Sequence, residues 1–538
     1  MVGTTATRAG FCGVDVGTSG VRAVIVDSSG QQLGVGTAAL PAGRRVGAEH
    51  EQSPEDWWMA LVSAVRAAAI GAAGVEVLAL AVDATSGTVL VEDSSGRSGG
   101  PALMYDDGRA QEQGERARAV GSWLWDQLGY RMQGSWALPK AMWLREHDAV
   151  GRGDKVVHQA DHLLRRLVGH PVPTDTSTAL KTGVDLRTAS WPVDVLHDLG
   201  ISTDILPAVV LPGTDLGTIS AHAARLTGLP VTTVVRAGMT DGCAAQIASG
   251  ALRPGQWSSA LGTTLVLKGA TAGLIRDRSG AVYCHRHPDG GWLPGGASSS
   301  GAGILGVLFP DAGPRQLRAL TDQARLESPV PGATYPLAGH GERFPFVAPD
   351  ARGFTSPHAS SPAEVFSAVC HGLAYLERLA YDVLGSLGAD VSGTVAFSGG
   401  ATGNAWWNQL RTDVLGRTTL LPRSTDAATG MAILAAATPG ALTATADAMV
   451  SISHTLTPDL HRGAALRGGY EDLVASLVDR GWLDADVASS ALGRLPTTPP
   501  EPMAASTSPE RDGGTPAAST RTSRAQDATD NHSTEARR

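Results

Sequence analysis

Two short segments of the sequence, about half a chain apart, share one pattern. Residues 14–26 read VDVGTSGVRAVIV and residues 259–269 read SALGTTLVLKG. Each segment has a β-rich run, a Gly-Thr-Ser/Thr turn and a second β-rich run, which predicts a β-hairpin. Two similar hairpins at this separation predict that one fold occurs twice in the chain.

The length of the chain agrees with a duplicated fold. At 538 residues and 55.3 kDa it is too long for one ordinary domain. We expect a first domain over residues 11–247 and a second over 248–482, ending at Trp482, the last aromatic residue. Residues 483–538 are rich in Pro, Ser, Thr and Ala, and we expect them to be disordered because they offer little apolar surface to bury.

Strand and helix patterns alternate in the N-terminal half. Residues 11–15, 21–26 and 32–39 predict three consecutive strands, and a helix is predicted from Pro54 with Ser53 as its N-cap. The predicted buried stripe of this helix consists of Trp58, Leu61, Val62, Val65 and Ala69. Further strands are predicted over 75–85 and 87–93. This alternation predicts an α/β layer architecture.

Composition and charge limit the binding partners and the cellular compartment that we expect for this chain. The formal net charge is −9 and 18% of the residues are charged, so we expect a small diffusing partner and no attraction to nucleic acid or membrane surfaces. The four cysteines are far apart, without metal-binding spacing, and residues 1–10 lack the apolar core of a signal peptide. No apolar run is long enough to span a bilayer. We therefore expect a cytoplasmic protein.

The turn of the first hairpin is a candidate phosphate site. Gly17 and Gly20 allow backbone N–H groups to point outward, and Thr18 and Ser19 add hydroxyl donors. Asp15, at the end of the preceding strand, has the ligand chemistry that Mg²⁺ prefers. The alternative is an ordinary hairpin whose aspartate caps the turn. The second hairpin favours the phosphate site, because two facing hairpins can clasp a polyphosphate between two domains.

Two further clusters carry candidate functional residues. Asp241 lies at a predicted helix start just before the second hairpin, where an isolated aspartate is most often an N-cap and a general base is the competing interpretation. Residues 395–416 predict a strand, a Gly399-Gly400 turn and a helix. Asn404 in this segment is a candidate contact to a ribose or base, whereas Trp407 is equally explained by core packing.

Two nucleotide-binding motifs are excluded. The sequence contains no Gly-x-x-x-x-Gly-Lys-Ser/Thr. Residues 301–306, GAGILG, match Gly-x-Gly-x-x-Gly, but the preceding segment is a poor strand and no βαβ unit surrounds it. We interpret this match as accidental.

At this point the chain resembles a known family, the FGGY carbohydrate kinases. The resemblance rests on five motifs in the expected order: GVDVGTSGVRAVIVD, EQSPEDWW, TDGCAA, ALGTT and FSGGATGNAWWNQLRTDVLG. It extends over residues 11–482. The segments HQADHLL, ALKTGVD, YCHRHPDGGWLPGGASSSGAGIL and GERFPF are most similar to the D-ribulose kinases of plants and cyanobacteria. Residues 84–88, ATSGT, stand where xylulose kinases typically carry Met-His-Gly.

The resemblance implies two ribonuclease-H-like, actin-type domains around a cleft, with sugar on the first and ATP on the second. Asp241 is then the catalytic base, Asp15, Ser86 and Asp241 contact the sugar, and Asp15 supports Mg²⁺. The residues implied to contact the nucleotide are Gly17, Thr18, Ser19, Gly262, Thr263 and Thr264 around the phosphates, and Gly400, Ala401, Asn404 and Trp407 around the adenosine.

Three positions depart from the pattern of the family. Asp426 stands where relatives usually have Glu, and Ala401 stands where a third Gly is common. The resemblance places both at the adenine side, where they bear on nucleotide preference. Asp106 stands where Asn is frequent, which bears on the sugar contacts.

The predicted reaction is ATP-dependent phosphorylation of a ketopentose, with D-ribulose as the expected substrate and its terminal hydroxyl as the acceptor. A kinase for xylulose, ribitol or a sugar acid is the nearest alternative. An actin- or Hsp70-like ATPase is a more distant one, because it predicts a peptide-binding domain after Trp482. A sugar sensor without catalysis would require the loss of Asp15 or Asp241, and both are present.

Overall fold

The computed structural model describes residues 8–326 and 329–494, and its first half is built on a six-stranded sheet. Strands β1, β2 and β3 form the predicted antiparallel meander, and β6 and β13 continue the sheet in parallel with β1. The sheet order is β12-β13-β6-β1-β2-β3. The strand bounds are β1 Arg8–Val16, β2 Gly20–Val26, β3 Gln32–Ala39, β6 Val75–Ala84, β12 Asp215–Thr218 and β13 Val234–Arg236.

The second half repeats this order in a seven-stranded sheet. Strands β14, β15 and β17 form the antiparallel meander, β20 and β21 run parallel to β14, and β22 closes the edge antiparallel to β21. The predicted duplication of one fold is therefore confirmed by the topology. The strand bounds are β14 Trp257–Leu261, β15 Leu265–Gly269, β16 Tyr283–Arg286, β17 Trp292–Ala297, β20 Val395–Ser398, β21 Thr419–Pro422 and β22 Ile452–Leu456.

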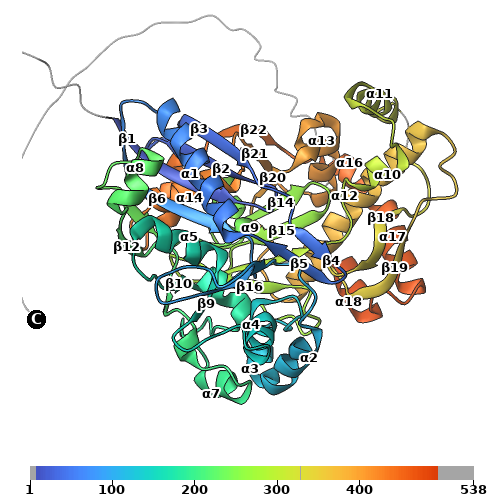
Figure 1. Cartoon of the computed structure of the whole chain (residues 1–538). Helices are drawn as coiled ribbons and strands as arrows, with labels where there is room; N and C mark the ends of the chain where they lie inside the picture. Colours follow the sequence, from blue (N-terminus) through green and yellow to red (C-terminus); the bar gives the residue numbers. More distant parts are fainter. Residues whose placement is uncertain (1–7, 327–328, 495–538) are drawn as a thin grey trace, which may run out of the picture. The chain divides into compact units, whose positions relative to one another are not determined.

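Helices cover both faces of the first sheet, and Figure 1 shows α1 lying along it. Helix α1 (Pro54–Gly71) begins after Ser53, as predicted, although the Ser53 side chain makes no capping hydrogen bond. Trp58, Leu61 and Val65 are buried, whereas Val62 and Ala69 are only partly buried. With α5 (Gln159–Val168) and α8 (Ala221–Thr227), α1 forms one core against the sheet.

The other face of the first sheet carries helices from both halves of the chain. Helices α9 (Asp241–Ser249) and α14 (Ala427–Ala436) pack on each other, and α14 packs on β1 and β6. The approach is so close that a Cβ atom on Gly13 would lie 1.8 Å from the Ala428 carbonyl oxygen, and one on Gly430 would lie 1.8 Å from that of Ala244. The two halves are thus joined by a layer of glycine and alanine contacts.

The remaining elements extend these two sheets. A five-stranded sheet of order β4-β5-β8-β7-β9 follows the first hairpin, and shorter strand pairs join β10 to β11 and β18 to β19. These strands are β4 Arg44–Val46, β5 Glu49–Gln52, β7 Val89–Glu92, β8 Ala102–Leu103, β9 Lys155–His158, β10 Thr174–Asp175, β11 Val209–Val210, β18 Tyr335–Glu342 and β19 Ala348–Phe354. The helices are α2 Gln111–Val120, α3 Ser122–Leu128, α4 Ala137–Glu146, α6 Thr176–Ala179, α7 Val193–Asp198, α10 Ile304–Leu308, α11 Pro314–Ala324, α12 Pro362–Ser386, α13 Ala405–Leu415, α15 Leu442–Met449, α16 Leu460–Ala465, α17 Arg467–Asp479 and α18 Ala485–Leu492.

One expectation about the C-terminal segment is wrong. Disorder was expected from residue 483, but α18 forms there and packs on α12 and α17. Leu483 and Ala491 are buried, and Asp484 caps the helix by accepting from two backbone N–H groups. After Trp482 the chain contributes only aliphatic side chains to this core, so the last aromatic residue does not mark its end. Residues 495–538 of the expected tail lie outside the described residues.

The structure bears on two expectations that were drawn from the composition. The four cysteines are free and buried, as expected for a reducing compartment. Among the described residues, no helix combines the length and apolar character that crossing a membrane requires. The described residues belong to one compact unit, so the boundary between residues 247 and 248 stays a prediction.

Candidate active site

A cavity of about 440 Å³ collects residues from both halves of the chain. Asp15 comes from the end of β1, Ser86 from the loop after β6, and Asp241 from the first turn of α9. The three side chains that the sequence predicts to contact a sugar therefore line one cavity. Its full lining is Asp15, Gly17, Thr18, Thr85, Ser86, Tyr105, Lys181, Thr240, Asp241, Gly242, Lys268, Tyr283, His285 and Ala427.

A second buried aspartate lies behind Asp15. Asp83 on β6 is the direct partner of Asp15 in the parallel register of β1 and β6, and its side chain is fully buried. Burial, with repulsion from Asp15 and Asp241, raises the pKa of Asp83 well above its ordinary value. Burial also raises the pKa of Asp15, and repulsion from Asp241 and Asp426 adds to this. The sequence analysis missed Asp83, although VDAT and VDVGT both place an aspartate near a strand end.

The loop that carries Ser86 is fixed by two lysines. Lys181 donates to the Ser86 carbonyl oxygen at 2.9 Å, and Lys140 donates to the carbonyls of Gly87 at 2.7 Å and Met104 at 2.6 Å. The Ser86 hydroxyl is buried, and no partner for it lies in the described part of the chain. Ser86 therefore brings a hydroxyl with unused hydrogen-bonding capacity to the lining of the cavity. Neither lysine was singled out by the sequence analysis, although Lys181 lies within the quoted ALKTGVD segment.

Asp241 is held at the start of α9 by a chain of polar contacts. The backbone N–H of Thr240 donates to the Ser177 hydroxyl at 3.2 Å, and this hydroxyl lies 3.0 Å from Nδ1 of His285. The Asp241 carboxylate accepts from the Gly242 N–H at 2.7 Å and is otherwise exposed. Thr240, and not Asp241, occupies the N-cap position. The carboxylate is therefore accessible to a bound hydroxyl.

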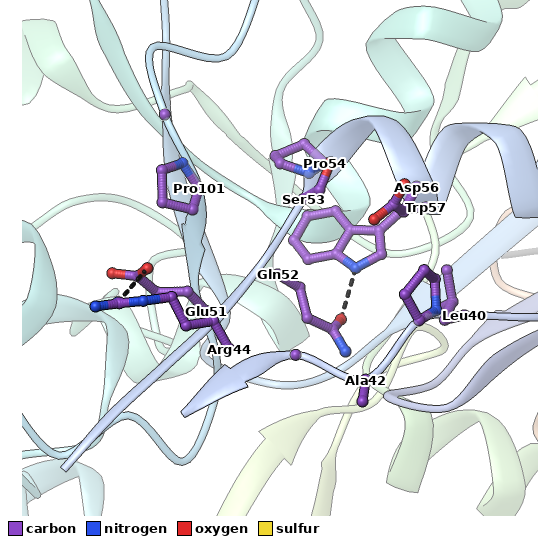
Figure 2. Close-up of a pocket in the computed structure, with 13 residues that line it drawn as sticks. Leu40, Ala42, Arg44, Glu51, Gln52, Ser53, Pro54, Asp56, Trp57 and Pro101 are labelled. Carbon is purple, nitrogen blue, oxygen red and sulfur yellow. Dashed lines mark hydrogen bonds and ion pairs between the residues drawn. The ribbon is translucent and has the colours of Figure 1, made fainter. Parts of the chain in front are cut away.

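The turn of the first hairpin is buttressed from outside the cavity. The Gly17 N–H donates to the Gly20 carbonyl at 3.0 Å, and the Gln52 side chain donates to the Thr18 carbonyl at 2.8 Å. Figure 2 shows Gln52 accepting from the Trp57 indole, at 2.8 Å, within a separate cavity of about 430 Å³. Gly17 and Thr18 line the cavity with Asp241, whereas Ser19 is exposed and lies outside its lining.

The turn of the second hairpin contacts the glycine-rich segment after β17. Ala302 donates its N–H to the Gly262 carbonyl at 2.9 Å, and Gly303 donates to the Thr263 carbonyl at 3.2 Å. A Cβ atom on Gly301 would lie 2.4 Å from Thr264 Cα. The GAGILG segment thus supports the second hairpin, which agrees with its interpretation as an accidental match to the dinucleotide motif.

A third cavity, of about 640 Å³, lies beside this turn and includes Ala302. Four of the residues expected around adenosine line it: Gly400, Ala401, Asn404 and Trp407. Asn404 caps α13 by accepting from the Trp407 N–H at 3.1 Å and donates to the Thr321 hydroxyl at 2.9 Å. The Trp407 indole is buried and donates to the Cys370 carbonyl at 3.1 Å, so it contributes to the core as well. The Gly262, Thr263 and Thr264 turn lies outside the linings of both cavities.

The structure changes the interpretation of two departures from the family pattern. Asp426 was expected at the adenine side, but it caps α14 and lies 3.5 Å from Arg22 of β2. Because α14 packs on β1 and β2, Asp426 belongs with the carboxylates around Asp15. Asp106 binds His50 and Arg45 and does not line the cavity; its neighbour Tyr105 does.

Comparisons with known proteins agree with this architecture. Residues 11–248 match the N-terminal domain of the FGGY family of carbohydrate kinases, and residues 261–438 match its C-terminal domain. The chain is 30% identical over 429 residues to the xylulose kinase of Streptomyces rubiginosus, covering 77% of this chain and 84% of that protein. It is 28% identical over 418 residues to the xylulose kinase of Klebsiella pneumoniae, covering 76% and 85%.

Solved structures support the fold. The xylulose kinase from Rhodospirillum rubrum superposes with a TM-score of 0.78 at 23% identity, covering 88% of this chain and 99% of that one. The Plasmodium falciparum glycerol kinase with ADP superposes with a TM-score of 0.74 at 14% identity, covering 89% and 99%. The expected pair of actin-type domains is thus confirmed. The chain belongs to the FGGY family of carbohydrate kinases, phosphotransferases that act on a sugar hydroxyl.

Proposed function

We propose that the protein transfers the γ-phosphoryl group of ATP to the terminal hydroxyl of a ketopentose, with D-ribulose as the substrate. The observation that carries this proposal is the convergence of Asp15, Ser86 and Asp241 on one cavity. A buried hydroxyl without a partner and an exposed carboxylate are the groups that a polyhydroxylated ligand requires there. The cytoplasm is the proposed compartment, in agreement with the four free cysteines.

Asp241 is the proposed catalytic base. Its carboxylate is free to accept the proton of the reacting hydroxyl, and Gly17 and Thr18 of the first hairpin turn, which line the same cavity, offer backbone and hydroxyl donors for phosphate oxygens. Phosphoryl transfer depends mainly on positioning and charge neutralisation, so the protein needs no covalent intermediate. Exclusion of water from the cavity would favour transfer to the sugar over hydrolysis of ATP.

The residues present fit a magnesium ion. Mg²⁺ is commonly bound by one or two carboxylates together with water and substrate phosphates. Asp15 lies in the cavity with its pKa raised by burial and by neighbouring carboxylates, and a cation would relieve this repulsion. Asp15 is the proposed ligand, directly or through water, and the bound ion would neutralise charge on the β- and γ-phosphates.

The choice of ketopentose has one specific alternative. The relatives named above are xylulose kinases, which favours D-xylulose. The ATSGT loop favours D-ribulose, because it places Ser86 where xylulose kinases typically have Met-His-Gly. A coupled ADP assay with D-ribulose, D-xylulose, ribitol and D-ribonate decides between them, and a sugar-independent ATPase activity alone would contradict the proposal.

The role of Asp241 is tested by Asp241→Ala. We expect kcat with the preferred sugar to fall by about 10²–10⁴, because a positioned general base contributes that much. The matched control is Asp198→Ala, which removes an exposed carboxylate at the end of α7. Undiminished sugar-dependent ADP release by Asp241→Ala would exclude it as the base.

A further inference from the structure

Lys268 contributes a positive charge to the sugar cavity. It lies on β15, four residues after the turn of the second hairpin, and lines the cavity together with Lys181 and Asp241. Gly242 makes room for it, because a Cβ atom there would lie 2.8 Å from Lys268 Cε. At the start of α9, Asp241 therefore supplies the exposed carboxylate and Gly242 leaves the space that Lys268 occupies.

The ammonium group of Lys268 has unused hydrogen-bonding capacity. Within residues 8–326 and 329–494, its one hydrogen-bond partner is the Cys243 sulfur at 3.6 Å, and no carboxylate lies within 4.0 Å. An ammonium carries three donors and thiol sulfur is a weak acceptor. Burial disfavours the charged form, but Cys243, Tyr283 and Asp241 raise the pKa of Lys268 overall, so the ammonium stays charged. A ligand bound in the cavity can supply a better acceptor for this ammonium group.

Lys181 and His285 surround the same region. Lys181 uses one hydrogen on the Ser86 carbonyl, which leaves further donors. Burial, with repulsion from Lys268 and Lys181, lowers the pKa of His285 well below its ordinary value, so the imidazole is neutral at neutral pH. Lys181, Lys268 and His285 line the same cavity, which therefore offers two cationic groups that only donate.

We propose that Lys268, with Lys181 beside it, binds the ketone oxygen of the sugar and thereby selects ketoses over polyols. A ketone oxygen has lone pairs and no hydrogen, so it can accept from both lysines. The hydroxyl of the corresponding polyol brings a hydrogen that must find another acceptor, and a buried donor left unpaired is costly. This inference rests on the proposed function, because it assigns a substrate oxygen within the proposed sugar site.

The test is calorimetric titration of D-ribulose, D-xylulose, ribitol and xylitol in the absence of nucleotide. We expect the wild-type protein to bind a ketopentose at least about tenfold more tightly than the matching polyol. Lys268→Met should weaken ketopentose binding by about 10- to 100-fold and remove the preference, because a hydrogen bond to a charged group is lost. Lys155→Met, which removes a lysine bound to the carbonyls of residues 204 and 206, should bind as wild type does.

Several outcomes would overturn the inference. They are a retained ketose preference in Lys268→Met, and a wild-type protein that prefers polyols or binds neither class. Lys268→Gln, which keeps a neutral donor, should be intermediate and serves if the methionine variant fails to fold. Binding is measured without ATP, so sugar binding without ADP release would refute the kinase proposal and leave the assignment of Lys268 standing.

Discussion

Lys140 is a fully buried cation whose two hydrogen-bond acceptors are both backbone carbonyls. Its ammonium joins the loop of Ser86 to the strand end before Tyr105, so it positions two parts of the cavity lining. Burial, with repulsion from Lys181, lowers the pKa of Lys140 to about 7. A neutral amine retains two hydrogens, which is enough for both carbonyls.

This pKa predicts a pH dependence of stability. Between pH 7 and 10 the unfolded chain keeps the proton on Lys140 while the folded chain loses it, so the free energy of unfolding rises with pH. The contribution is up to about 1.4 kcal/mol per pH unit and is absent in Lys140→Met. Denaturant unfolding of both proteins from pH 6 to 10 measures it. Parallel curves for the two proteins would contradict the lowered pKa.

At the scale of elements, the contact of α14 with β1 ties the second half of the chain to the strand that carries Asp15. Gly13 allows this contact, because a Cβ atom there would overlap the backbone of Ala428 and Ala432. Backbone on both sides leaves no flexible side chain to move aside. The position of Asp15, two residues later, depends on this glycine.

We expect Gly13→Ala to lower the free energy of unfolding by at least about 1–3 kcal/mol through overpacking. Gly468→Ala is the matched control, since Gly468 lies within α17 and faces open space. An alanine there should be neutral or stabilising by about 0.5–1 kcal/mol. Urea denaturation of the two variants provides the comparison, and equal effects would refute the packing argument.

At the scale of the whole molecule, the kinase fold extends through α18 to residue 494. This helix and Leu483 pack with α12 and α17 in one core cluster, whereas α9 and α14 belong to another. Ala427 is the last residue along the chain that lines the cavity of the proposed sugar site. Helix α18 therefore supports the fold without lining that cavity.

Truncation distinguishes the two parts of the C-terminal segment. We expect a chain ending at Arg494 to keep the melting temperature and the sugar kinase activity of the full chain. A chain ending at Trp482 should lose at least about 2 kcal/mol of unfolding free energy, because it lacks the buried side chains of Leu483, Ala488 and Ala491. Thermal unfolding and ADP release measure both variants. Loss of activity in the chain ending at Arg494 would show that residues 495–538 contribute to function.

The sequence predicted the features that local patterns encode. The meander of β1, β2 and β3, the start of α1 and the second hairpin follow from strand periodicity, turn glycines and helix-start residues, which act over a few positions. The duplicated fold followed from one repeated hairpin. Asp15 and Asp241 were proposed because each lies in a motif with a recognisable neighbourhood, and Ser86 was proposed from the resemblance to the family.

Tertiary structure decided which distant residues meet. Neither Asp83 nor Lys268 was singled out from the sequence. Asp83 lies behind Asp15 because β6 pairs with β1, and Lys268 lines the cavity because Gly242 leaves space beside β15. Asp426 was expected at the adenine side. It lies instead with the carboxylates around Asp15, because α14 packs on the first sheet. Burial and charge repulsion depend on distances in space, so the raised pKa of Asp83 and the position of the Lys268 ammonium follow from the packed chain and not from the order of its residues.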